Sequence, residues 1–243
     1  MKKKTFTLIE LMIVCAIIGI LASILLPSLV KAKEKALLTV CMSNQSQMSK
    51  RIFIYAKDKN DRIPPYKEDG TNIDNGHNTR YFYYSGTWSS RRNLAYLWNA
   101  EDEVDAGKML FCPAQKNDVY MYETYAPFPT ASAPSWSGWS NRIRLSYNYN
   151  PWRYDDTTWT PRYKQLHEFD DEMIMSTDLF TEARQMKDKK DILSHASIYS
   201  MSVGRGDGSV RIKRSRGLMT TIRTKDWESI SDLNQMSEIL SAP

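Results

Sequence analysis

The chain has 243 residues and a formal net charge of +5, with 33 Lys and Arg against 28 Asp and Glu. Three of the positive charges are Lys2, Lys3 and Lys4, so the rest of the chain carries only +2, which argues against nucleic acid as the main partner. Three cysteines are too few for a disulfide-dense scaffold or for a zinc site with four cysteine ligands.

An apolar run opens the chain between two groups of lysines. It extends over residues 6–30 and contains a single charged residue, Glu10. A helix of that length measures roughly 37 Å at about 1.5 Å per residue, which is enough to cross a hydrocarbon core of about 30 Å. We therefore predict a transmembrane helix over 6–30. A carboxylate inside such a segment is costly unless it has a partner, so Glu10 is expected to be functional.

The residues around this glutamate resemble the start of a type IV prepilin or a type II secretion pseudopilin. The segment from Lys2 to Glu10 reads KKKTFTLIE. The resemblance implies that a prepilin peptidase removes the leader 1–5 by cutting between Thr5 and Phe6, and that the new amine of Phe6 is methylated. It also implies that Glu10 of one subunit neutralises the Phe6 amine of its neighbour in a filament. Thr5 stands where the family usually has glycine.

Two other N-terminal signals fit the sequence less well. A secretory signal has a shorter apolar core that ends in a small-residue cleavage site. A lipoprotein signal would use Cys15, but Met12, Ile13 and Val14 supply no small residue before it. Cys15 is predicted to be an apolar filler inside the bilayer.

The helix is predicted to continue beyond the membrane, with a kink at Pro27 rather than an end. Residues 31–58 then form an amphipathic continuation that docks on the head, and Pro64-Pro65 follow its end. Its apolar stripe consists of Leu37, Leu38, Cys41, Met48, Ile52 and Tyr55.

The remaining residues, 59–243, are predicted to form one extracytoplasmic head. Short strands are expected over 80–84, 108–111, 142–149 and 173–177, then a hairpin with strands 198–203 and 209–212, and a closing helix over 226–240. The hairpin turn covers 204–208, where Asp-Gly supplies positive-φ positions. The predicted fold class is α+β and pilin-like: a long N-terminal helix packed on an antiparallel sheet with long aromatic-rich loops.

Later segments resemble a narrower group of prepilin-like proteins that end in an H-x9-DG motif. They are Cys41-Met42-Ser43-Asn44, Cys112-Pro113, Ser146-Tyr147-Asn148-Tyr149-Asn150, and His195 followed by Asp207-Gly208. Eleven residues separate His195 from Asp207 here, not nine. These two could bind a metal together, but two residues do not make a site, and a structural His with a turn Asp is the favoured interpretation. The sequence thus predicts no metal and no cofactor.

Cys41 and Cys112 leave two interpretations open. A disulfide would tie the amphipathic helix to the head, provided that the two Cα atoms lie within about 7 Å. Alternatively, both are reduced and each fills its own buried pocket. Sequence spacing says nothing about the distance.

The resemblance implies a structural subunit of a type IV pilus-like or type II secretion-like filament. Its partners would be the prepilin peptidase and methyltransferase, other pilin-like subunits and the inner membrane, with the N-terminus cytoplasmic and the head periplasmic or extracellular. The chain carries no phosphate loop, no G-x-S-x-G and no H-E-x-x-H, so we expect no enzyme.

An alternative function follows from the aromatic loops. Their rings could stack on sugars and make the head a membrane-anchored carbohydrate-binding module, or they could simply cover a loop-rich core. The candidate rings are Trp136, Trp139, Trp152, Trp159, Tyr147, Tyr149 and Tyr154.

Overall fold

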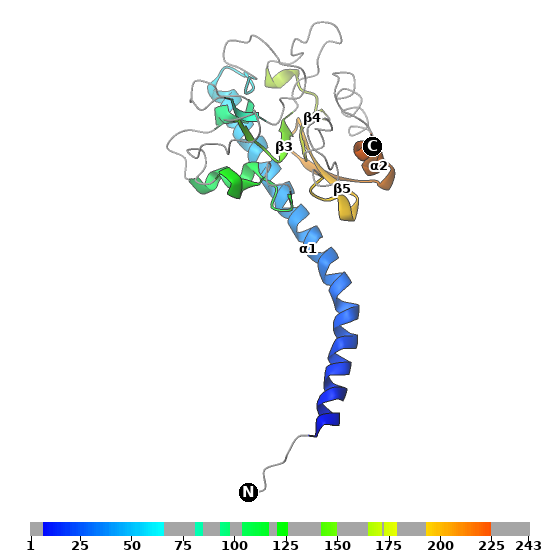
Figure 1. Ribbon diagram of the computed structural model, residues 1–243. Coiled ribbons are helices and arrows are strands. Elements are labelled where there is room, and N and C mark those ends of the chain that lie inside the picture. Colours follow the sequence, from blue (N-terminus) through cyan, green and yellow to red (C-terminus); the bar gives the residue numbers. More distant parts are fainter. Residues whose placement is uncertain are drawn as a thin grey trace.

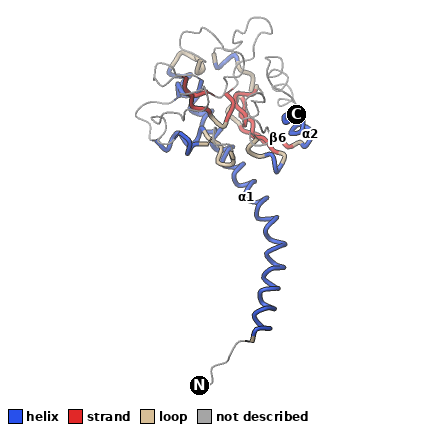
Figure 2. Tube along the Cα trace, viewed as in Figure 1, coloured by secondary structure: helices blue, strands red, loops and turns tan. Residues whose placement is uncertain are grey.

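A computed structural model describes residues 7–65, 81–84, 93–97, 104–116, 121–125, 142–149, 165–171, 173–178 and 193–224. One long helix, α1 (Leu8–Asp58), runs from the amino-terminal end into a head that holds the other described elements (Figure 1). Figure 2 shows the strands gathered in that head, beside the far half of α1. The long N-terminal helix and the antiparallel sheet confirm the predicted α+β class.

The first half of α1 packs against nothing else in the described part of the chain. Between Leu8 and Val30 the exposed fractions of the large apolar side chains range from 45% at Val14 to 74% at Leu8. Among the described residues, α1 is the one helix long and apolar enough to span a membrane. We call residues 8–30 the apolar half of α1.

The helix continues through Pro27 without a break, and Figure 1 shows it bending on its way to the head. Pro27 has no backbone N–H to donate, so one bond of the helical ladder is missing there. Two hydroxyls nearby bond back to the preceding turn: Ser23 Oγ donates to the Ile20 carbonyl at 2.7 Å and Ser28 Oγ to the Leu25 carbonyl at 2.8 Å. The expected absence of a helix end at Pro27 is confirmed.

The second half of α1 buries one stripe against the head, and we call residues 34–56 the docked half. The predicted apolar positions lie in this stripe, with Leu37 and Tyr55 partly buried. Three polar side chains share it, which the apolar pattern did not reveal. The buried residues are Glu34, Leu38, Cys41, Gln45, Met48, Ser49, Ile52 and Ala56.

The main sheet has four antiparallel strands in the order β3-β4-β5-β6. They are β3 (Tyr147–Tyr149), β4 (Ile174–Asp178), β5 (Ser200–Arg205) and β6 (Val210–Arg214). A second sheet pairs β1 (Tyr81–Tyr84) with β2 (Arg142–Arg144). The strand predicted over 142–149 is therefore two strands in different sheets, separated by Leu145 and Ser146.

Short helical turns fill several of the connections. They are the 3-10 helices η2 (Asn93–Leu97), η3 (Val104–Leu110), η5 (Tyr122–Tyr125), η6 (Leu166–Glu168) and η8 (Ala196–Ile198). The strand predicted over 108–111 is wrong, because Lys108–Leu110 belong to η3. The Phe111 N–H bonds back to the Lys108 carbonyl at 3.1 Å, which closes a turn in place of a strand ladder. Ile198 likewise ends η8 rather than starting β5.

The end of the chain also differs from expectation. Gly204 and Arg205 belong to β5, not to the turn, because β5 pairs with β4 and β6 up to these residues. A Cβ at Gly204 would lie 2.4 Å from Ser176 Oγ, so glycine is what allows the close approach of the two strands. A helix that was not predicted, α2 (Arg216–Thr224), follows β6. The helix predicted over 226–240 lies outside the described residues.

The two faces of β5 contact different layers. Met201 and Val203 form an apolar cluster with Ile174 of β4 and Ile222 of α2. Ser202 and Gly204 alternate with them and face the docked half of α1, where Gln45 lies against both. The larger apolar cluster combines α1 with η2, η3, β3 and Met175. The helix–sheet contact is therefore apolar at β3 and Met175 and polar where α1 crosses β5.

Candidate functional site

The amino-terminal end of α1 is closed by a capping box. Thr7 is the N-cap, and its Oγ1 accepts the Glu10 N–H at 3.3 Å. In return, Glu10 Oε2 accepts the Thr7 N–H at 2.9 Å and the Thr7 hydroxyl at 2.8 Å. This reciprocal pair satisfies donors that a helix start leaves without partners. In a single chain, the carboxylate of Glu10 thus has a local partner.

Sequence reasoning assigned Glu10 to filament assembly and missed this local role. The signal was present, since Thr7-Leu8-Ile9-Glu10 has the T-x-x-E spacing of a capping box in front of an apolar run. Thr5 and Phe6, the predicted cleavage and methylation residues, lie outside the described residues. The pairing of Glu10 with an amine of Phe6 therefore stays a prediction.

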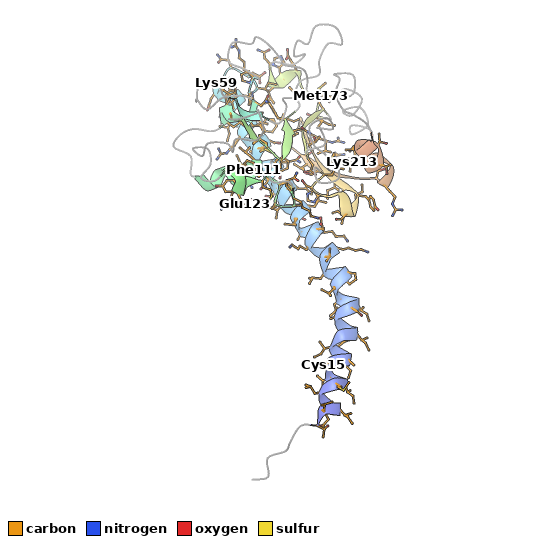
Figure 3. All side chains as sticks on the ribbon, in the orientation of Figure 1. Cys15, Lys59, Phe111, Glu123, Met173 and Lys213 are labelled. Atoms are coloured by element: carbon orange, nitrogen blue, oxygen red, sulfur yellow. A yellow bond between two sulfur atoms is a disulfide. The ribbon has the colours of Figure 1, made fainter. Side chains whose placement is uncertain are left out.

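A second group of polar residues is buried where the docked half meets the sheet. Cys41 and Cys112 form a disulfide with their Cα atoms 5.4 Å apart, so the structure has the paired form of the two open interpretations. The bond joins α1 to the turn that follows η3 across 71 positions of sequence. The third cysteine, Cys15, is free and exposed on the apolar half (Figure 3).

The carboxylate of Asp178, at the end of β4, lies next to this disulfide. Its Oδ2 accepts the backbone N–H of Ser202 at 2.6 Å, and its Oδ1 accepts the Ser202 hydroxyl at 2.8 Å. The Gln45 amide of α1 donates to the same Oδ1 at 3.5 Å. Burial raises the pKa of Asp178, while His195 and the bonds from Ser202 and Gln45 act in the opposite direction.

His195 completes the group from the turn before η8. Its Nε2 lies 3.4 Å from Cys112 Sγ, its side chain is buried, and its Nδ1 has no hydrogen-bond partner among the described residues. Burial lowers the pKa of His195, and the carboxylates of Asp178 and Glu34 oppose that shift. Glu34 is itself buried, with one oxygen 3.6 Å from Lys116 Nζ and the other without a partner in the part of the chain that the structure describes.

The weak motifs of the sequence meet at this place. In the C-x-S-N segment, Cys41 is bonded to Cys112. Asn44 of the same segment donates its Nδ2 hydrogen to the Phe111 carbonyl at 3.2 Å. Asn44 Nδ2 also lies 3.4 Å from the hydroxyl of Tyr147 in the S-Y-x-x-N segment. His195 then contacts Cys112. Their common location gives these scattered motifs a shared role in joining helix and sheet.

Asp207 has a different role from His195. It is exposed in the turn between β5 and β6, where its Oδ1 accepts the Ser209 N–H at 2.7 Å. Gly208 follows with a φ of +81°. The turn interpretation of Asp207-Gly208 is confirmed, and His195 lies against Cys112 rather than forming a pair with Asp207.

The candidate sugar-binding aromatics gain no support. Tyr147 and Tyr149 are fully buried, where Tyr149 donates its hydroxyl to the Pro64 carbonyl at 3.3 Å. They belong to the core rather than to a binding surface. The other candidates, Trp136, Trp139, Trp152, Trp159 and Tyr154, lie outside the described residues.

Comparison with protein families finds a match at the start of the chain. The model of the prokaryotic N-terminal methylation motif matches residues 1–26. No curated protein and no solved structure matches the chain. The matched segment contains the Thr7–Glu10 capping box and the first part of the apolar half. An N-terminal apolar helix that carries this motif is typical of a membrane-anchored precursor. This match supports a precursor of the type IV pilin or pseudopilin type.

Proposed function

We propose that this protein is a structural subunit of a type IV pilus-like or type II secretion-like filament. The observation that carries the proposal is the apolar half of α1, which bears the methylation motif and has no packing partner in its own chain among the described residues. An exposed apolar surface of this size is typical of a segment that contacts lipid or another protein. Lipid would cover it before assembly, and the same halves of neighbouring subunits would cover it in the filament.

Glu10 would change its hydrogen-bond partner when the subunit moves from the membrane into the filament. In the single chain, its carboxylate accepts both the backbone and hydroxyl donors of Thr7. After cleavage before Phe6, a subunit carries a positive amine four residues upstream of Glu10. In a filament, the Glu10 carboxylate of one subunit would then compensate the Phe6 amine of another, because an unpaired charge in apolar surroundings is costly.

The head would lie on the periplasmic or extracellular side, with the amino terminus cytoplasmic. Lysines alone do not decide the orientation, since Lys2–Lys4 precede the span and Lys31, Lys33 and Lys35 follow it. The disulfide between Cys41 and Cys112 supports the proposed orientation, because disulfides persist in oxidising compartments. The partners of this protein would be the prepilin peptidase and other pilin-like subunits. Its role would be structural rather than catalytic.

Processing is tested by mass spectrometry of the amino terminus in cells that contain an active prepilin peptidase. The mature chain should begin at Phe6 and carry a methyl group. Thr5→Gly should raise the rate of cleavage, because it restores the residue that the family has before the cut. A mature chain that still begins at Met1 would contradict the proposal.

Assembly is tested with two variants of Glu10 that separate its two roles. Glu10→Gln keeps an oxygen that can accept the Thr7 N–H, because glutamine also serves in a capping box, but it removes the charge. Glu10→Ala removes both. We expect neither variant to enter filaments with wild-type subunits, although both insert into the membrane. Assembly of Glu10→Gln at the wild-type level would show that the charge is not needed.

A further inference from the structure

Four side chains with metal-binding atoms meet where α1 crosses the sheet. Cys41, Cys112, Asp178 and His195 are all buried, and each offers an atom that lies within 4.8 Å of the others. They come from α1, from the turn after η3, from the end of β4 and from the turn before η8. Sequence spacing gave no sign of such a set, because 17 or more positions separate each ligand from the next in the chain.

The distances suit a small tetrahedral ion. Zinc binds sulfur at about 2.3 Å and nitrogen or oxygen at about 2.0–2.2 Å, so its ligand atoms lie about 3.3–3.8 Å apart. The 3.4 Å between Cys112 Sγ and His195 Nε2 is already in that range. The other atoms need movements of about 1 Å to reach this geometry. With their Cα atoms 5.4 Å apart, the two sulfurs can separate by side-chain rotation.

One ligand is held in place in advance, and a second is not committed to another partner. The two bonds from Ser202 and the bond from Gln45 fix the Asp178 carboxylate beside the disulfide. Such outer hydrogen bonds orient metal ligands and raise their affinity. The His195 ring is 2% exposed, and its polar contact among the described residues is the weak one to sulfur. Its Nδ1 has no partner among the residues that the structure describes, so none of them commits the ring to another hydrogen bond.

We propose that Cys41, Cys112, Asp178 and His195 form a zinc site when the disulfide is reduced. The disulfide and the zinc site exclude each other, because a sulfur bonded to sulfur offers no thiolate. A phosphine reduces the bond by taking oxygen from water: the disulfide gains two electrons and two protons and becomes two thiols, and the phosphine becomes its oxide. Zn²⁺ then displaces one proton from each thiol and binds two thiolates, the carboxylate and the neutral imidazole. This site is independent of filament assembly.

The test uses the full chain in detergent micelles, reduced with a water-soluble phosphine, equilibrated with Zn²⁺ and desalted. We expect one zinc per reduced chain and none per oxidised chain. Cobalt in place of zinc should show thiolate charge-transfer bands and the visible spectrum of a tetrahedral ion. Zinc should also slow alkylation of Cys41 and Cys112 while Cys15, on the apolar half, reacts at its usual rate.

Variants identify the ligands. Loss of a hydrogen-bond partner of a ligand costs about 10- to 100-fold in metal affinity, so His195→Ala and Asp178→Ala should cost at least that. His167→Ala is the matched control, because His167 is exposed and pairs with Asp61 instead. If the reduced chain loses its packing without metal, zinc should restore it, because binding then contributes to folding. A reduced chain that binds no zinc, folded or not, overturns the proposal, as does equal binding by the oxidised chain.

Discussion

The two halves of α1 have the same helical backbone but opposite relations to the rest of the chain. In the apolar half, every described side chain except partly buried Ala22 is exposed, and no stripe is distinguished from the others. In the docked half, one stripe is buried and the remaining faces carry Lys, Ser, Gln and Asn. A uniformly apolar surface suits surroundings that are apolar on every side, whereas a single stripe suits one partner. The helix is thus built for two different contacts.

The polar residues of the two halves also differ in how far away in the sequence their hydrogen-bond partners lie. Glu10 bonds to Thr7, three residues away in sequence. Gln45 bonds to residues more than 130 positions away, on β4 and β5. The carboxylate of Glu10 is therefore satisfied within the helix, whereas the buried amide of Gln45 is satisfied by the sheet of the head. Paired substitutions in the two halves should separate these dependencies.

The largest difference is expected at the cysteines. Replacing Cys41 and Cys112 together by alanine should lower the free energy of unfolding of the head by about 4 kcal/mol, because the disulfide closes a long loop in the unfolded chain. Cys15→Ala, in the apolar half, should leave that free energy unchanged. Denaturant unfolding of the full chain in micelles, followed by tryptophan fluorescence, measures both. Equal stability of the two variants would contradict the comparison.

A smaller difference is expected between two isoleucines. Ile52 is 1% exposed in the docked half and Ile20 is 62% exposed in the apolar half. Ile52→Ala should cost about 3 kcal/mol, since it removes buried methyl groups and leaves a cavity. Ile20→Ala should have no effect on unfolding of the head. The same unfolding experiment applies, and a loss from Ile20→Ala as large as that from Ile52→Ala would show that the halves are coupled.

The buried amide of Gln45 gives a third comparison, here with an exposed glutamine of the same helix. Gln45→Ala should cost about 2 kcal/mol, because the buried Ser176 hydroxyl loses the acceptor Gln45 Oε1 and the buried Asp178 carboxylate keeps, among the described residues, only its two bonds from Ser202. Gln47 is exposed and bonds to Ser43 at 3.4 Å, so Gln47→Ala should change little. Should Gln45→Ala unfold at the wild-type denaturant concentration, the polar contact with the sheet contributes nothing to stability.

The smallest effect is expected just beyond the end of α1, at the pair of Asp61 and His167, and it depends on pH. The ring and backbone N–H of His167 bond to Asp61 and hold the pKa of that exposed carboxyl below its usual 3.8. The ionised form is therefore favoured by folding, so its contribution is present above pH 3.8 and disappears as the pH falls below that value. The contribution is small because the pair is exposed.

Asp61→Asn tests this with little backbone strain, since Asp61 has a φ of 65° and asparagine also tolerates that region. The variant should be slightly less stable than wild type at pH 7, and the difference should vanish in acid. Asp58→Asn, one turn earlier and exposed, is the control. A difference between wild type and Asp61→Asn that grows on acidification would refute the assigned sign.

The sequence predicted those parts of the molecule that depend on local pattern. The length of the apolar run, the stripe around Leu38 and Ile52, and the Asp207-Gly208 turn all follow from spacing between near neighbours. The strand predicted around Leu110 was wrong because three apolar residues suit a strand or a 3-10 turn equally well. Contacts with the rest of the head determine which of the two forms. Gly204 was assigned to the turn because its close approach to Ser176 is not visible in its neighbours.

The buried polar group could be predicted only in part. Cys41, Cys112 and His195 stood out in the sequence, but their distances depend on how η3 and the turn before η8 fold against α1. Asp178, Gln45 and Glu34 did not stand out in the sequence, because polar residues resemble surface residues until the surface that they pack against is known. The capping box of Thr7 and Glu10 was readable from spacing.

The position of the disulfide has a mechanical consequence. A pull on the apolar half, directed away from the head, would begin to peel the docked half off the sheet at its first buried residue, Glu34. Peeling of this kind breaks a few non-covalent contacts at a time, and each requires little force. It would stop two turns later at Cys41, where the load passes to a covalent bond with Cys112. Tension along the helix axis then reaches the head through that bond, and the contacts from Gln45 to Ala56 carry none of it.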